Sequence, residues 1–280
     1  MGTIYFKNGG GTKDMIEVTP QPIIVSTGVG FHHEFLKWIE NEKIEWRPSP
    51  NISFLENLYE FAGRLCYESW KLEDGSFVNK NLTKIREGNF DYIKNILEVD
   101  HGSVLEHGSI VILFHNVSRV FTHELVRHRV GTAMSQTSGR YVRYDNIKFW
   151  IPPSIYELGV ADHFKDIIAA TEDTIRGIYD GLDINNEKNF SIKKKITSAI
   201  RRIAPNGLAN NILFSFNGRS LRHILKMRTS PQAEEEMQFV MKILQYKMEK
   251  EFPSLLQDFI KQSLSKIDEA LQIENKRVVE

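Results

Sequence analysis

Apolar and polar positions follow two different periods along this chain. Between Ser53 and Trp70, large apolar residues recur every three or four positions, which predicts an amphipathic helix. Short runs rich in β-branched and aromatic residues predict strands instead, namely "QPIIVSTGVG" (21–30), "SIVILF" (109–114) and "NNILFSF" (210–216). Further helices are predicted for residues 91–99, 160–204, 221–228 and 233–270.

The segment after the second strand predicts a helix with two distinct faces. Ser118 is the expected N-cap, because its hydroxyl can accept a hydrogen bond from the first turn. Gly131 is expected to end the helix, so that Arg127, His128 and Arg129 lie in the last turn, where the helix dipole favours cations. The apolar face is expected to carry Val117, Phe121 and Leu125. The polar face is expected to carry Arg119, His123 and Arg127.

Together these elements predict an α+β fold. We expect a single mixed domain with a central sheet flanked by helices and a long C-terminal helix. Residues 1–50 are weakly patterned and are interpreted as an N-terminal extension or edge elements, and residues 51–280 as the catalytic domain.

Composition narrows the classes of function. The chain has 280 residues, and its 36 Lys+Arg residues balance 36 Asp+Glu residues, so no overall positive field favours a nucleic acid polymer or a membrane surface. No apolar run reaches the length of a membrane span. Cys66 is the only cysteine, which excludes an internal disulfide and favours a reducing compartment. We therefore expect a cytoplasmic enzyme.

One short stretch, "RHRVGTAMSQTSGRY" (127–141), is unusually rich in hydrogen-bond donors. Its three arginines are Arg127, Arg129 and Arg140, and guanidinium groups bind phosphates and carboxylates through two parallel hydrogen bonds. Small residues between them would let the backbone approach a ligand. The alternatives are a solvated basic turn or a DNA-binding turn, and the second has no basic stripe elsewhere to support it.

Two other segments carry clustered polar residues. "HGSVLEH" (101–107) precedes the second strand, and five of the nine histidines lie between His101 and His128. It is either a loop with capping groups or the edge of a ligand site. "NGRSLRHILKMR" (217–228) adds Asn217, Arg219, Arg222, His223 and Arg228, and by itself it also fits an ordinary charged helix face.

In this order the three segments resemble one family, the flavin-dependent thymidylate synthases. "RHR" followed by Ser-x-Arg-Tyr resembles the family signature, and "HGSVLEH" is similar to its His-x-Ser/Thr-x-x-Glu-His segment. "NGRSLRHILKMR" resembles the Asn-x-Arg-Ser-Leu segment, and "QAEEEM" occupies the place of His-Ala-Gln-x-Glu. The resemblance covers roughly residues 55–255.

The resemblance implies a reaction and a set of site residues. The reaction is the FAD-dependent reductive methylation of dUMP to dTMP, with methylenetetrahydrofolate as carbon donor and NADPH as reductant, in a homotetramer whose sites combine several chains. The implied FAD contacts are His101, Ser103, Arg127, His128, Arg129, Gln136, Asn217, Arg219 and His223. The implied nucleotide contacts are Glu124, Arg127, Gln136, Ser138, Arg140, Arg201 and Arg228, with Ser138, Arg140 and Arg201 at the phosphate.

The chemistry of uracil methylation fits the role implied for Arg228. C5 becomes reactive when electron density is raised at C5 and C6, and a cysteine thiolate added to C6 is one way to raise it. Cys66 lies in an apolar helical pattern without a basic partner, so we expect it to be a core residue rather than a nucleophile. An arginine beside N3 and O2 of the pyrimidine is the electrostatic alternative.

The chain departs from the family pattern at three places. The loop after "RHR" is one residue longer, with Ser135-Gln136 where Asn-Glu is usual, and Gln232 replaces a His. Glu124 replaces a Gln, and a carboxylate can only accept hydrogen bonds. Helical spacing places Arg127 and His128 within reach of Glu124, so we expect Glu124 to be a brace paired with one of them.

Three alternative functions stay open. The first is C5 alkylation of another pyrimidine nucleotide, such as UMP or dCMP, by the same flavin chemistry. The second is a metal-dependent hydrolase built on His101, Glu106 and His107, although no metal is expected in the leading interpretation. The third is a nucleotide-binding protein without catalysis.

Overall fold

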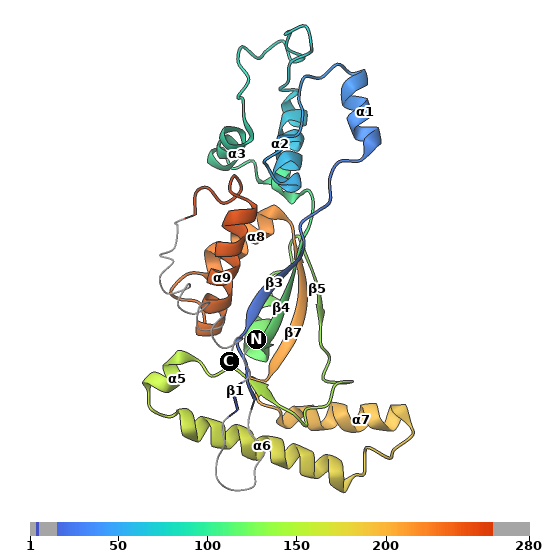
Figure 1. The fold of residues 1–280 in the computed structure, drawn as a ribbon, viewed down its shortest axis with the longest axis vertical. Helices are drawn as coiled ribbons and strands as arrows, with labels where there is room; N and C mark the ends of the chain where they lie inside the picture. The colour runs from blue at the N-terminus through green and yellow to red at the C-terminus, as the bar shows by residue number, and fades with distance from the viewer. Residues whose placement is uncertain (1–3, 6–15, 260–280) are drawn as a thin grey trace.

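The computed structural model describes residues 4–5 and 16–259. The molecule is elongated, with a central sheet in the middle, a group of helices at one end and a second group at the other (Figure 1). We call the first group the helical cap (residues 31–106) and the second the arm (residues 147–208). The expected α+β class with a central sheet and flanking helices is confirmed.

The central sheet has four antiparallel strands in the order β3-β4-β7-β5. Their bounds are β3 Gln21–Ser26, β4 Ile110–Ser118, β5 Thr132–Gln136 and β7 Ala209–Phe216. In the two central strands Ile110 pairs with Phe216 and Ile112 with Phe214, and all four side chains are buried. Because side chains alternate between the faces of a strand, one register places every second residue of both strands in the core.

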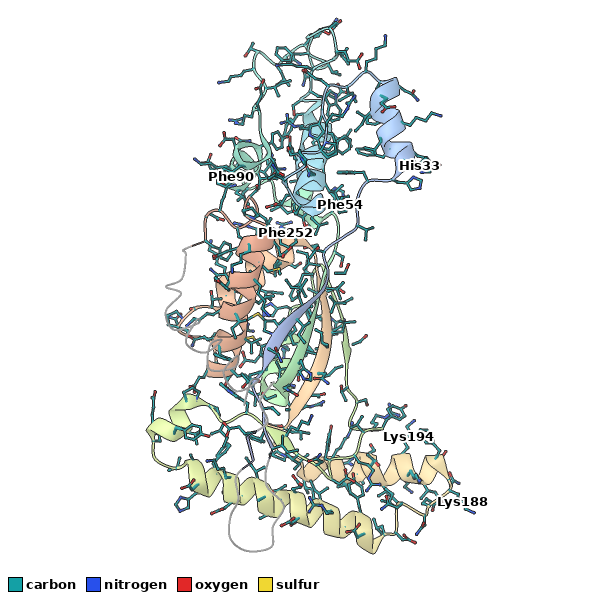
Figure 2. All side chains as sticks on the ribbon, viewed as in Figure 1. His33, Phe54, Phe90, Lys188, Lys194 and Phe252 are labelled. Carbon is teal, nitrogen blue, oxygen red and sulfur yellow. The ribbon has the colours of Figure 1, made fainter. Side chains whose placement is uncertain are left out.

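Helices cover that buried face. They are α4 Arg119–Leu125, α8 Gly218–Arg228 and α9 Glu235–Glu251, and α8 and α9 lie against one side of the sheet (Figure 1). Met237, Met241 and Leu244 of α9 are fully buried in the same core as the strands. Phe252, just after α9, belongs to this core, and Phe54 of the helical cap packs against it (Figure 2). The cap is therefore joined to the sheet by shared apolar packing.

The helical cap has its own aromatic cluster. Its elements are α1 His33–Asn41, α2 Phe54–Tyr67, α3 Asn89–Glu98 and the 3₁₀ helix η1 Gly102–Glu106. Phe61 packs between Trp46 and Trp70, with ring centroids 5.3 and 5.5 Å away. Arg64 is buried and donates to Glu60 at 2.8 Å, so the cap also contains a buried ion pair. These contacts hold the long connection between α2 and α3 in place.

The arm forms a second core. It contains β6 Lys148–Phe149, α5 Pro153–Glu157, α6 Ala161–Gly181, α7 Phe190–Ile200 and the 3₁₀ helix η2 Arg201–Ile203. β6 joins a small sheet with β1 Ile4–Tyr5 and β2 Ile16–Glu17. Ile147, Ile175 and Tyr179 are buried in the core of the arm. None of the helices in the described part of the chain is both long enough and apolar enough to cross a bilayer.

Several predicted bounds differ from the structure. The predicted helix 160–204 is two helices, because the chain turns after Leu182 and Asn189 caps α7 by accepting from Ser191 and Ile192 backbone N–H groups. The predicted helix 233–270 ends at Glu251, because Pro253 disfavours helical geometry at the residue before it. Residues 260–270 of that prediction lie outside the described residues.

The prediction that Cys66 is a core residue is wrong, since its side chain is exposed. It follows Leu65, which is 50% exposed, near the end of α2. The buried face of α2 includes Leu55, Tyr59 and Ala62, and Cys66 lies four residues after Ala62, where the helix leaves the core. The helical spacing of apolar residues in the sequence therefore extends one turn beyond the part of α2 that is buried.

Candidate active site

The turn between α4 and β5 carries Arg127, His128 and Arg129. The helix ends at Leu125, so the expectation that these residues form its last turn, with Gly131 as its end, is wrong. The N–H groups of Arg127 and His128 bond to carbonyls three residues back, at 3.2 and 3.1 Å, which tightens the chain out of the α-helix. The N-cap at Ser118 is confirmed, because its Oγ accepts from the Phe121 N–H.

This turn forms one wall of a cavity of about 460 Å³. The opposite wall comes from the start of α8, and η1 contributes Glu106. The residues around the cavity are Glu106, Arg127, His128, Arg129, Val130, Asn217, Arg219, Ser220, His223 and Ile224. Segments about 100 residues apart in the sequence thus meet at one site, and the volume is in the range of small-molecule sites.

Two glycines let the walls come this close. Gly131 has φ +66°, and a Cβ there would lie 2.2 Å from Nδ2 of Asn217 and 2.3 Å from Oγ of Ser220. A Cβ on Gly102 would lie 2.8 Å from Nε of Arg219. Asn217 is the N-cap of α8 and accepts from the Ser220 N–H at 2.8 Å. Glycine is therefore needed at 131 for both its backbone conformation and its space.

The cavity is cationic. Arg219 donates to Glu106 at 2.6 Å, so this pair is neutral overall. The guanidinium groups of Arg127 and Arg129 have no ion-pair or hydrogen-bond partner among the described residues. Two unpaired arginines beside an amide and two imidazoles favour an anionic ligand that carries a flat ring.

Arg228 does not line this cavity, but it is bonded to His128, which does, and it is held by two groups. Its Nη1 donates to Oε2 of Glu124 at 2.8 Å, and its Nε donates to Nε2 of His128 at 3.0 Å. Burial, with Arg228 and then His223 adding repulsion, lowers the pKa of His128 to about 4. His128 is therefore neutral at pH 7 and accepts at Nε2. The prediction that Glu124 pairs with Arg127 or His128 is wrong, because its partner is Arg228.

The remaining residues predicted to bind FAD lie outside this cavity. The ring of His101 stacks with that of Tyr67, and the Tyr67 hydroxyl lies 2.9 Å from its Nδ1. Ser103 is exposed on η1 and does not line the cavity. Gln136 is on β5 and donates to Oγ1 of Thr122 at 2.7 Å.

A second cavity of about 330 Å³ lies at the other end of β7. Three arginines from two segments meet there, which makes it a second candidate anion site; its lining is Arg119, Gly139, Tyr144, Arg201, Arg202, Ala204, Pro205, Asn206 and Leu208. Arg201 was predicted from the sequence. Ser138 and Arg140 flank Gly139 but line neither cavity, and Arg140 is exposed above the Tyr141 ring.

The residues of the metal alternative do not come together. Among the described residues, one His/Cys/Asp/Glu group has its ligand atoms within 4.8 Å of one another, and it consists of exposed residues His32, His33 and Glu34. Glu106 is bonded to Arg219 instead. The hydrolase built on His101, Glu106 and His107 therefore has no geometric support.

Sequence reasoning missed several lining residues. Ser220 and Ile224 follow Asn217 at helical spacing on the same face of α8, so the predicted helix contained a signal for them. Arg202 directly follows the predicted Arg201. Arg119 was placed on the polar face of α4, but nothing in its local sequence indicated a shared cavity with Arg201.

These features define a class of protein: an α+β protein with cation-rich cavities for an anionic ligand that carries rings. Residues 53–254 match the Thymidylate synthase complementing protein (Thy1) family. A flavin-dependent thymidylate synthase from Mycobacterium avium (strain 104) is 34% identical over 187 residues, which are 64% of this chain and 70% of the relative. One from Mycobacterium tuberculosis (strain ATCC 25618 / H37Rv) is 33% identical with the same coverage. The chain belongs to this family of enzymes.

Solved structures share the fold. A flavin-dependent thymidylate synthase from Helicobacter pylori, complexed with FAD and dUMP, aligns with a TM-score of 0.53 and 22% identity over 74% of this chain and 95% of that one. A UMP/dUMP methylase, PolB from Streptomyces cacaoi, bound with 5-Br UMP, aligns with a TM-score of 0.59 and 14% identity over 88% of this chain and 96% of that one.

Proposed function

We propose that this protein methylates dUMP to dTMP by FAD-dependent reductive methylation, with methylenetetrahydrofolate as carbon donor and NADPH as reductant. The observation that carries the proposal is Arg228, which is held by Glu124 and by the neutral His128, a residue that lines the cationic cavity. Membership in the Thy1 family supports the same reaction.

The cavity fits a flavin cofactor. Arg127 and Arg129 offer unpaired guanidinium groups, and the glycines at 102 and 131 leave room for close packing of the walls. We assign the cofactor to Arg127, His128, Arg129, Asn217, Arg219 and His223, with His101, Ser103 and Gln136 as further contacts that follow from the resemblance alone. When bound and reduced, the flavin would supply the hydride that reduces the transferred one-carbon unit to a methyl group.

Arg228 is the catalytic residue in this proposal. Its guanidinium has an Nη2 that is not used by Glu124 or His128, so it can donate to O2 of a pyrimidine and to N3 once N3 has lost its proton. A guanidinium that stabilises negative charge on N3 and O2 favours the enolate-like form of the pyrimidine, in which C5 is nucleophilic. Cys66 is exposed on α2 and lines none of the cavities described above, so no thiolate is available for C6.

The phosphate of the nucleotide is assigned to Ser138, Arg140 and Arg201. Only Arg201 lines a cavity in this chain, and the exposed Arg140 points to a site completed by another copy. Half-exposed residues on the second face of the sheet, such as Leu213 at 37%, favour association as well. We infer a homotetramer with composite sites. The division into residues 1–50 and 51–280, and a cytoplasmic location, stay predictions.

A second substrate is favoured by one observation. Arg228 donates to Oε2 of Glu124, so Oε1 stays able to accept a hydrogen bond from a ribose hydroxyl. The family's Gln has an amide nitrogen in place of this second oxygen, and an amide nitrogen only donates. UMP is therefore the alternative substrate. dCMP has no such support.

The test is flavin retention together with release of the C5 hydrogen from dUMP, UMP and dCMP. The purified protein should keep flavin absorbance after desalting or regain it with added FAD, and dUMP should react fastest. Arg228→Ala should keep the flavin and lose C5 hydrogen release. A protein that binds no FAD in either redox state would overturn the proposal, and faster release from UMP would replace the substrate.

A further inference from the structure

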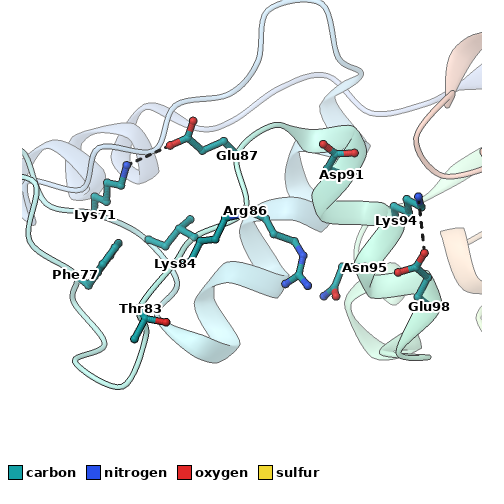
Figure 3. A pocket seen from close by; sticks show the side chains of 11 residues that line it. Lys71, Phe77, Thr83, Lys84, Arg86, Glu87, Asp91, Lys94, Asn95 and Glu98 are labelled. Carbon is teal, nitrogen blue, oxygen red and sulfur yellow. Dashed lines mark hydrogen bonds and ion pairs between the residues drawn. The ribbon is translucent and has the colours of Figure 1, made fainter.

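Glu236 of α9 carries a buried carboxyl group that the function proposed above does not use. In the helical cap, by contrast, Glu87 is exposed and pairs with Lys71 at 3.2 Å beside a cavity of about 670 Å³ (Figure 3). Glu236 is 2% exposed, and among the described residues no cation lies within ion-pair distance of it. Because a buried charge without a counter-ion is costly, this carboxyl group depends on its hydrogen bonds.

Both oxygens of Glu236 bind one residue, Ser118. The N–H of Ser118 donates to Oε1 at 2.7 Å, and its hydroxyl donates to Oε2. The same hydroxyl oxygen accepts from the N–H of Phe121 at 3.0 Å, which makes Ser118 the N-cap of α4. Because the carboxylate takes the hydroxyl proton, the lone pairs of Oγ are left for the first turn of the helix. Glu236 therefore orients the group that caps α4.

Helix α4 depends on the contacts at its two ends. It has seven residues, fewer than an isolated helix needs to be stable in water. At its start the cap is bonded to Glu236, and the N–H of Val120 donates to the carbonyl of Asn206 at 3.2 Å. Near its end Glu124 accepts from Arg228 at 2.8 Å. These contacts join α4 to α9, to the connection before β7 and to α8.

The same short helix leads from one cavity to the other. Arg119, directly after the cap, lines the second cavity. Arg127 and His128, just beyond the end of the helix, line the cationic cavity. At 1.5 Å per residue the helix is about 10 Å long, so a shift at its start is carried to its end. The bond between Glu236 and Ser118 therefore bears on both cavities.

The neighbouring Glu235 makes the same kind of contact to a different element. The N–H and the hydroxyl of Ser154 in α5 donate to its two oxygens at 3.1 and 2.6 Å. No residue of α5 lines either cavity. Two adjacent carboxylates of α9 thus bind a serine in the same way, and Glu236 is the one whose serine caps the helix between the cavities. Glu235 is therefore a matched control.

We propose that Glu236 is a positioning residue for the reaction, which sets the place of α4 and through it of Arg119 in the second cavity and of Glu124 beside Arg228. The proposal rests on the function proposed above, because the two cavities are assigned there to the nucleotide phosphate and the flavin. The ionised carboxylate accepts both donors of Ser118. The protonated acid keeps one good acceptor, so the nucleotide binds more tightly when Glu236 is ionised.

Few groups determine the protonation of Glu236. Among the described residues, Ser118 is the hydrogen-bond partner of its carboxyl group, and Glu234 is the charged residue near it, on its own helix. Burial is the largest cause that raises its pKa to about 7, the bonds from Ser118 lower it, and Glu234 adds a smaller rise. Glu236→Gln keeps one acceptor and replaces the other by a donor, so it mimics the protonated acid at every pH.

Equilibrium binding of dUMP to the flavin-loaded protein tests the proposal without turnover. Calorimetry would compare wild type and Glu236→Gln at about pH 6 and about pH 8, on either side of the ordinary histidine range. The two proteins should bind dUMP equally at the lower pH, and wild type should bind about fivefold more tightly at the higher pH. The variant cancels the ionisation of the nucleotide itself, because both proteins share it. Glu235→Gln and Glu87→Gln should behave as wild type.

Turnover separates positioning from general stability. Glu236→Ala and Ser118→Ala should each raise the KM for dUMP about tenfold and lower kcat less, and Glu236→Gln should recover part of the loss. The double variant should lose less than the product of the two single losses, because both substitutions break one contact. Flavin absorbance and the thermal midpoint establish that each variant is folded. If Glu236→Ala does not fold, the pH comparison with Glu236→Gln decides.

Hydrogen exchange of α4 gives a readout that does not need the reaction. The amides of Phe121 and Leu125 should exchange about tenfold faster in Glu236→Ala and at the wild-type rate in Glu235→Gln. If no nucleotide is methylated but these amides lose protection and dUMP binding weakens, the proposed reaction fails and the positioning role stands. Equal dUMP binding by wild type and Glu236→Gln at both pH values would overturn the positioning role, as would equal effects of Glu235→Gln and Glu236→Gln.

Discussion

Arg228 and Glu124 lie 104 residues apart in the sequence and form an ion pair with Nη1 2.8 Å from Oε2. Both side chains are partly shielded from water, with exposed fractions of 19% and 33%. Arg228 ends α8 and Glu124 is near the end of α4, so the pair joins two helices beside the cationic cavity. With the bond from Arg228 to His128, it fixes the plane of the guanidinium group.

Loss of this pair should reduce turnover more than flavin binding. In Glu124→Ala the guanidinium of Arg228 loses one of its two anchors, and we expect kcat to fall by about ten- to a hundredfold. Glu124→Gln keeps an acceptor for Arg228 and should recover most of the rate. Measurement of C5 hydrogen release at saturating dUMP, with flavin absorbance as control, checks both variants.

The same variants distinguish the two roles of Glu124. If Glu124 acts only as the brace of Arg228, the preference for dUMP over UMP should be the same in wild type and Glu124→Gln. A wild type that prefers UMP, with the preference lost in Glu124→Gln, would show that Glu124 binds the ribose and that dUMP is the wrong substrate.

Cys66 should be dispensable for catalysis. Its side chain is exposed, so Cys66→Ala removes little packing and should change the free energy of unfolding by no more than about 0.5 kcal/mol. Turnover should stay within a few-fold of wild type, and the thiol should react with a thiol reagent in the folded protein. A thousandfold loss of turnover with flavin still bound would contradict the electrostatic role of Arg228.

Stability should depend on pH through Glu236 of α9. Burial raises the pKa of Glu236 to about 7, even though it accepts hydrogen bonds from the N–H and hydroxyl of Ser118. Between the ordinary value of 4.5 and about 7, the folded state holds a proton that the unfolded state releases, so this group lowers stability as the pH rises through that window. His128 has the opposite effect, because its pKa of about 4 in the folded state lies below its ordinary value of 6.5. Between these values the unfolded state binds the proton more readily, so the free energy of unfolding falls as the pH drops from 6.5 toward 4.

Thermal unfolding between pH 4.5 and 7 measures the two contributions. Glu236→Gln cannot ionise, so it should lack the decline on the alkaline side, a difference on the order of 1–3 kcal/mol at pH 7. Glu249→Gln, on the same helix, is the control and should keep the profile of the wild type. A Glu236→Gln profile that matches wild type would mean that the carboxyl does not change its protonation on unfolding.

Composite sites can be tested by mixing subunits. Arg127→Ala removes a cation from the cavity assigned to the flavin, and Arg140→Ala removes the exposed arginine assigned to a phosphate in another copy. Oligomers assembled from both variants should recover activity, because some sites then contain two intact contributions. Mixed oligomers, verified by two affinity tags, that show no recovery would place both arginines in the same chain's site.

Local patterns alone predicted most of the elements. The strands β4 and β7, the helices α2, α3 and α8, and the N-cap at Ser118 follow from side-chain periods and short-range hydrogen bonding, which depend only on neighbours in the sequence. Helix ends were less predictable. The split between α6 and α7 and the early end of α4 depend on competing turn hydrogen bonds and on packing against the sheet.

By itself the sequence determined which chemical groups are present, the polar start of α8 and the α+β order of helices and strands, but it assigned the Arg-His-Arg residues to the end of a helix and not to the turn after it. The tertiary structure alone decided that Gly131 meets Asn217, that Glu124 holds Arg228, and that Cys66 faces water. The physical reason is the distance along the chain over which each interaction acts. The spacing of apolar residues and the capping of a helix depend on contacts within one turn. The contacts named above form only when segments up to about a hundred residues apart pack on a shared core, and no local pattern encodes which side chains then meet.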